Sequence, residues 1–121
     1  MTIDRMEEIL NEIAEEIPKD FYKYLNGGIL LIPDCKIHPK AVNNDLFVLG
    51  EYHIDRDLGR YIIIYYGSFQ YIYGYLPEIR LREKLKEVLV HEFTHHLESL
   101  AGERDLEIKD AAFIEKHKKY E

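Results

Sequence analysis

The sequence predicts a small α+β domain, with a sheet from the middle of the chain packed against helices from both ends. Apolar residues recur at steps of three and four over residues 3–17, which is typical of a helix with one buried stripe, and Pro18 ends the pattern. The longest helical pattern covers residues 78–101. Runs typical of strands lie between these helices, at residues 29–32, 46–53 and 60–66. Strands grouped between helices are the order expected of an α+β fold.

Turn and loop signals separate these elements. Asp20 is a candidate cap for a second short helix, which is expected to end at Gly27 and Gly28. The polar segment 33–44 contains two prolines and is expected to be a loop. Residues 55–59 have the composition of a turn, so the strands on either side should form a hairpin. For residues 67–75, rich in Tyr and Gly, strand, turn and irregular structure all stay open.

The C-terminal part of the chain is expected to be helical. Gly102 is predicted to end the long helix, because glycine readily takes the left-handed conformation found at helix ends. A final helix is expected over residues 110–119. No linker or repeat divides the sequence, so residues 1–121 are expected to form one domain.

Composition narrows the classes of function. A net charge of −7 argues against nucleic-acid binding, which needs clustered Lys and Arg. The single cysteine, Cys35, excludes an intrachain disulfide and a cysteine-rich zinc ribbon, and it suits a reducing compartment. No apolar run approaches the ~20 residues that span a bilayer, and the acidic N-terminus is unlike a signal peptide. We therefore expect a cytoplasmic protein with no membrane contact, of undetermined oligomeric state.

The pattern His-Glu-x-x-His is the feature most informative about chemistry. Residues four apart share one helix face, so His91 and His95 can both direct ring nitrogens at one metal ion, zinc by preference. Glu92 is offset by about 100°, where its carboxylate can act as general base on a water molecule beside the ion. Apolar residues fall on the far side of the helix: Leu89, Phe93, Leu97 and Leu100. The pair is therefore predicted to face a cleft.

The alternative to a metal site is an ordinary polar helix face with two surface histidines, because short motifs also match by chance. His96 lies off the predicted metal face, so we expect it to pack or form hydrogen bonds. A hydroxyl from the tyrosines of residues 60–75 could stabilise an oxyanion. Cys35 is expected to be a small buried or loop residue and not a nucleophile. The other histidines are expected to be loop, strand-edge and surface residues, any of which could approach the site in three dimensions: His38, His53 and His117.

Asp105 is the predicted third metal ligand, with Glu98 as the alternative. Glu98 shares the helix face of His91 but lies about 10.5 Å further along the axis. A chain reversal at Gly102 would bring Asp105 back towards the two histidines. If neither residue binds the ion, water or a residue from the sheet takes the third position.

The chain resembles the family of small bacterial zincin-like metallopeptidases. The similar segments are FVLGEYH, GRYIIIYYGSF, VLVHEFTHH and the later Gly-x-x-Asp of residues 102–105. The resemblance implies a minimal zincin-like domain, with a small sheet on a central helix that holds His91 and His95 as zinc ligands and Glu92 as general base. The family's Gly and Asp come one helical turn earlier, where this chain has Glu98 and Ala101.

What the resemblance implies about activity is zinc-dependent hydrolysis of a peptide or protein bound in a shallow cleft. An extended substrate would pair with the edge strand of the sheet by main-chain hydrogen bonds. Two alternatives stay open: another metal-dependent hydrolase, such as a nuclease, and a non-catalytic module in which the metal only stabilises the fold.

Overall fold

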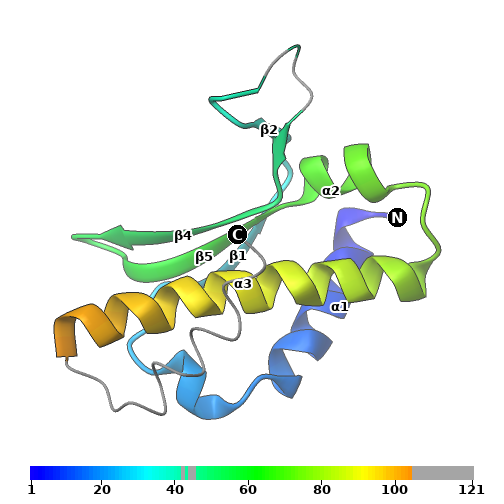
Figure 1. Ribbon diagram of the computed structural model, residues 1–121. Helices are drawn as coiled ribbons and strands as arrows, with labels where there is room; N and C mark the ends of the chain where they lie inside the picture. Colours follow the sequence, from blue (N-terminus) through cyan, green and yellow to red (C-terminus); the bar gives the residue numbers. More distant parts are fainter. Residues whose placement is uncertain (42, 44–45, 105–121) are drawn as a thin grey trace.

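The computed structural model describes residues 1–41, 43 and 46–104 and has the α+β architecture expected from the sequence (Figure 1). Two long helices, α1 and α3, lie on one side of a small mixed sheet. The elements in chain order are α1 (Ile3–Glu16), the 3-10 helix η1 (Lys19–Tyr22), β1 (Gly28–Ile32), β2 (Lys36–Ile37), β3 (Phe47–Val48), β4 (Gly50–Asp55), β5 (Gly59–Tyr65), α2 (Tyr66–Tyr73) and α3 (Glu78–Arg104).

The main sheet has the strand order β1-β5-β4, so β4 is an edge strand. β1 runs parallel to β5, and β4 pairs antiparallel with β5 in the hairpin that the sequence predicts. Asp55 builds the turn: its carboxylate accepts hydrogen bonds from the N–H groups of Asp57 (2.7 Å) and Leu58 (3.0 Å). Gly59 closes the turn with φ +77°, a conformation that favours glycine. The turn fixes the register in which His53 faces Tyr61.

The hydrophobic core lies between the sheet and the helices. Side chains alternate along β5, so Ile62 and Ile64 enter the core while Tyr61 and Ile63 lie on the other face of the sheet. Each of the core residues named here exposes at most 1% of its surface, and they come from α1, β5 and α3: Met6, Ile9, Ile13, Ile62, Ile64, Leu85, Leu89 and Phe93. The apolar stripe of α1 and the far side of α3 are thus buried as predicted.

Long-range packing accounts for several differences from the predicted elements. The predicted loop of residues 33–44 contains β2, which pairs antiparallel with β3 at Phe47–Val48. The predicted strand of residues 46–53 is interrupted at Leu49, and β4 continues to Asp55. Residues 66–73 form α2, where Phe69 is fully buried in the core. None of these contacts leaves a local periodic signal.

The predicted helix limits were wrong at two places. The short helix after Asp20 is only the 3-10 turn η1, with Pro18 at its N-cap. Gly102 does not end the long helix, because α3 continues to Arg104. One glycine weakens an exposed helix by only about 1 kcal/mol, less than the packing of a residue such as buried Leu100 contributes.

The predicted helix of residues 110–119, His117 and Asp105 lie outside the described residues. Within the described part of the chain, no helix has the length and apolar character needed to cross a membrane.

Candidate metal centre

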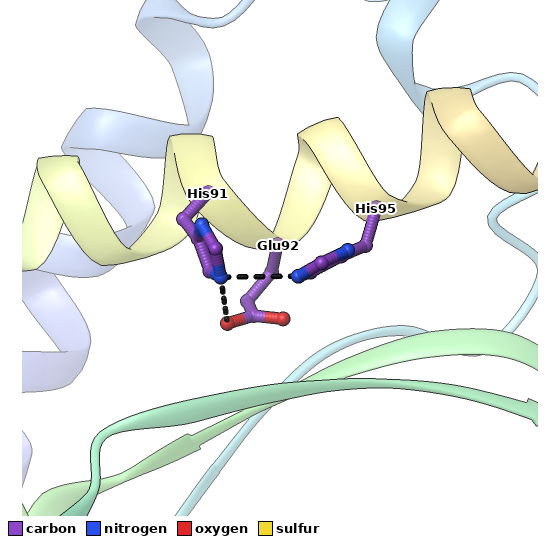
Figure 2. A group of neighbouring side chains, drawn as sticks. All are labelled: His91, Glu92 and His95. Atoms are coloured by element: carbon purple, nitrogen blue, oxygen red, sulfur yellow. Dashed lines mark hydrogen bonds and ion pairs between the residues drawn. The ribbon is translucent and has the colours of Figure 1, made fainter. Parts of the chain in front are cut away.

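Three side chains from one turn of α3 meet on the side of the helix that faces the sheet (Figure 2). The Nε2 atoms of His91 and His95 are 3.0 Å apart, and their rings stand nearly perpendicular, at 83°. Oε2 of Glu92 lies 4.0 Å from Nε2 of His91. The spacing in the sequence predicts this convergence, and the structure brings all three residues together.

The two histidines fit a zinc ion. Each Zn–N bond is about 2.1 Å, and a tetrahedral angle separates two such nitrogens by about 3.4 Å. The observed 3.0 Å between the Nε2 atoms of His91 and His95 is close to that value, so small ring rotations would complete the geometry. Candidate ligand atoms of His91, Glu92 and His95 all lie within 4.8 Å of one another.

The triad lies in a cleft of about 580 Å³ between α3 and the edge strand. Gly50–Ile54 of β4 line the wall opposite the triad, and Lys36 and His38 lie in the same lining. β4 passes very close to α3 at Gly50, where a Cβ atom would lie 2.8 Å from Val88 and 3.3 Å from Cγ of Glu92. Gly50 therefore sets the spacing of the two walls, a role that the sequence alone does not indicate.

Glu92 is buried on the floor of this cleft. Only 4% of its surface is exposed. Burial raises the pKa of its carboxyl group to about 8, and the negative charge of nearby Glu51 adds to the shift. Of the residues that the structure describes, none donates a hydrogen bond to this carboxylate. A positive ion beside it would oppose the shift and favour the charged form.

Glu51 of β4 is a cleft residue that the sequence analysis missed. Its carboxylate accepts hydrogen bonds from Lys36, the hydroxyl group of Tyr65 and His53. Burial alone would raise its pKa, but these three donors together lower it to about 2. Glu51 is therefore a permanent negative charge, and it is neutralised by its neighbours on the strand wall.

His96 connects α3 to the sheet by hydrogen bonds, which is the role predicted for it from the sequence. The backbone carbonyl of Lys23 accepts a hydrogen bond from Nε2 at 2.8 Å, so Nε2 holds the proton of the neutral ring. Burial lowers the pKa of His96 and keeps it neutral. Nδ1 then accepts a hydrogen bond from Tyr52 at 2.7 Å, and the Tyr52 hydroxyl accepts one from Arg60 at 2.9 Å.

The tyrosines predicted as oxyanion stabilisers do not line this cleft; the tyrosine that does is Tyr52. Its hydroxyl proton is used by His96, so it is not directed at a substrate. Among the predicted tyrosines, Tyr73 lines a neighbouring pocket that His91 and Glu92 also border. Tyr65 instead donates its hydroxyl proton to Glu51.

The remaining predicted site residues have mixed outcomes. His38 and His53 both line the cleft, and Cys35 is exposed. Asp105 lies outside the described residues, so its role as third ligand stays a prediction. The reversal at Gly102 that was to bring Asp105 back is absent, because the helix continues past it. Oε1 of Glu98 lies 3.9 Å from Nδ1 of His95, which is the nitrogen not facing His91. Glu98 thus lies behind the ring of His95, on the side away from His91.

Comparison with known proteins relates the chain to a solved structure. No known protein-family profile matches the chain, and no curated protein sequence matches it. Among solved structures, a conserved hypothetical protein from Thermus thermophilus, TTHA0227, is 34% identical with a TM-score of 0.72. The match covers 84% of this chain and 99% of that one, so it includes the whole fold of the relative. The chain therefore belongs to the same family as this conserved hypothetical protein, whose name states no activity.

Proposed function

We propose that the protein is a zinc-dependent hydrolase of the zincin type, acting as a metallopeptidase. The observation that carries the proposal is the meeting of His91, Glu92 and His95 at a cleft whose opposite wall is an edge strand. Two imidazole nitrogens 3.0 Å apart and a buried carboxylate beside them are among the protein groups that zinc-dependent hydrolysis uses.

Each residue has a distinct part in the proposed reaction. His91 and His95 hold the ion through their Nε2 atoms, and Glu98 orients the ring of His95. A bound zinc ion would polarise the substrate carbonyl group and make a neighbouring water molecule more acidic. Glu92 accepts the proton of the attacking water at a carboxylate oxygen and returns it to the nitrogen of the leaving amine.

The edge strand favours a peptide as substrate. Among the residues that the structure describes, β4 pairs with β5 alone, so its other edge can pair with an extended chain. Such pairing would place the peptide backbone along the wall opposite Glu92. The cleft of about 580 Å³ accommodates a few residues of a peptide.

Zinc content and peptide hydrolysis together test the proposal. Protein produced without a His-tag should contain about one zinc ion per chain by elemental analysis. His91→Ala and His95→Ala should each remove most of it. Glu92→Gln should retain zinc and reduce hydrolysis of a peptide library by a factor on the order of 10² or more. Glu87→Gln, which removes an exposed carboxylate from the same helix, is the matched control and should change neither.

Each component of the proposal can fail separately. Full zinc content in both histidine variants would exclude the metal site. Loss of zinc from Glu92→Gln would make Glu92 a ligand instead of a base. A wild-type protein that holds zinc but cleaves no peptide would favour a non-catalytic metal-binding module.

A further inference from the structure

The strand wall of the cleft contains a cluster in which one carboxylate is surrounded by donors. Glu51 accepts hydrogen bonds from Lys36 through Oε2, and from Tyr65 and His53 through Oε1. The ammonium group of Lys36 also lies 5.6 Å from the centre of the Tyr65 ring. The ring of His53 stacks on that of its cross-strand partner Tyr61, with 5.2 Å between ring centres and 13° between ring planes, which restricts its orientation.

The exposed part of this cluster is mainly Lys36 and His53. The side chain of Glu51 is 22% exposed, whereas Lys36 is 38% exposed and His53 is 39% exposed. A lysine ammonium group has three N–H donors, and the hydrogen bond to Glu51 uses one of them. His53 already donates from Nε2 to Glu51, so the donors that a ligand meets in the cleft are those of Lys36.

The position of the cluster relates it to one set of substrate side chains. Side chains alternate along β4: Gly50 and Tyr52 lie towards α3, and Glu51 and His53 lie on the other face. Because Glu51 and His53 also line the cleft, the cleft extends over the free edge of β4 onto that face. A peptide paired with the free edge of β4 alternates in the same way. Every second peptide side chain would then lie beside Glu51 or His53.

We propose that Lys36 forms a subsite that selects peptides with an acidic side chain, presented on the face of β4 away from α3. This inference rests on the proposed peptidase function, because it assumes that the peptide lies along β4. The chain as a whole has a net charge of −7, so an exposed ammonium group in the lining of the cleft is a local exception. Glu51 positions this ammonium group and receives little of the substrate's contact.

Peptide binding to zinc-loaded Glu92→Gln protein tests this subsite without requiring turnover. The probes are fluorescent peptides in which a single Glu moves along a neutral sequence, each compared with the same peptide containing Gln. By anisotropy, the Glu peptide should bind about fivefold more tightly, the ratio of a favourable half-exposed ion pair. The preference should recur at alternate positions, because side chains of an extended chain alternate.

Lys84 provides a closely matched control. It is 41% exposed, pairs with Glu87 and lies 5.6 Å from the ring centre of Tyr73, but it is outside the cleft lining. Lys36→Met, introduced into the Glu92→Gln protein, should abolish the preference for Glu, and Lys36→Arg should retain it. Lys84→Met should leave it unchanged. If Lys36→Met fails to fold, Lys36→Met/Glu51→Gln removes the unpaired carboxylate and should likewise show no preference.

The results separate this subsite from the proposed function. Equal binding of Glu and Gln peptides, a preference retained without Lys36, or no peptide binding would each overturn the subsite. A preference that depends on Lys36 supports it even if the wild type cleaves none of the peptides. In that case the hydrolytic function fails while the acidic-peptide subsite stands.

Discussion

Glu92 and Glu51 are two glutamates on opposite walls of the same cleft, and their pKa values are shifted in opposite directions. Burial raises the pKa of Glu92 on α3 to about 8, with a contribution from the charge of Glu51. Burial also opposes the charge of Glu51, but hydrogen bonds from Lys36, Tyr65 and His53 lower its pKa to about 2. The main difference between the two sites is the presence of hydrogen-bond donors.

This difference separates two roles in the proposed reaction. A carboxyl group with a raised pKa can gain and lose a proton near neutral pH, which a general base and acid must do. A carboxylate surrounded by donors keeps its charge and orients those donors instead. Glu92 is therefore the candidate proton carrier, and Glu51 is the residue that shapes the strand wall.

The largest effect should be on the pH dependence of stability in the metal-free protein. Between the ordinary pKa of 4.5 and about 8, folded Glu92 holds a proton that the unfolded chain has lost. The unfolded state binds fewer protons there, so the free energy of unfolding should fall as pH rises, by up to about 1.4 kcal/mol per pH unit. Urea denaturation from pH 5 to pH 8 measures this slope.

Variants of both glutamates sharpen this prediction. Glu92→Gln should flatten the slope above pH 5, and so should saturating zinc, because a cation favours the charged carboxylate. Glu51→Gln should instead change the free energy of unfolding at acidic pH. The stability from the lowered pKa of Glu51 is present above 4.5 and is lost as pH falls towards 2, so this variant should lose less stability in acid. A slope above pH 5 that is unchanged in Glu92→Gln would contradict the raised pKa.

The helix wall of the cleft could be predicted from the sequence, and the strand wall could not. His91, Glu92 and His95 lie within one and a half helical turns, so the helix period alone brings their side chains together. Glu51 reaches the cleft through the pairing of β4 with β5 and the close passage of β4 beside α3. These contacts join segments far apart in the chain, and no motif spacing encodes them.

The fold shows the same division between local and long-range information. The limits of α1 and the turn between β4 and β5 follow from Pro18, Asp55 and Gly59, whose effects are local. α2 depends on burying Phe69, and β2 depends on a partner strand and on Ser68, which accepts a hydrogen bond from the Lys36 N–H at 2.9 Å.

The strand β4 and the helix α3 that flank the cleft each contain a glycine, and Gly50 of β4 should be more sensitive to substitution than Gly102 of α3. In Gly50→Ala the new methyl group would lie 2.8 Å from Val88 and 3.3 Å from Glu92, so β4 and α3 would have to separate. Such overpacking destabilises proteins by about 1–3 kcal/mol. Urea denaturation of the metal-free protein measures the loss in the free energy of unfolding. A change below about 0.5 kcal/mol would mean that β4 and α3 move apart at little cost in free energy.

The smallest effect should come from substitution of Gly102 in α3, and the sign of the resulting change in the free energy of unfolding is informative. Gly102 lies inside α3, and a Cβ atom there would have no neighbour within 4 Å. Gly102→Ala should therefore raise the free energy of unfolding by about 0.5–1 kcal/mol, because alanine loses less backbone entropy on folding. If Gly102 instead ended the helix in a left-handed conformation, alanine would destabilise the protein by about 1 kcal/mol.

The zinc affinity of Gly102→Ala completes this test of the helix wall. With α3 continuing past residue 102, the substitution should leave zinc affinity unchanged, measured by competition with a chelator. A destabilised variant that also binds zinc more weakly would place the chain reversal at Gly102. That result would restore the route by which Asp105 was predicted to reach His91 and His95. A stabilised variant with unchanged affinity would instead leave Glu98 as the orienting carboxylate and direct the search for a further ligand away from a turn at Gly102.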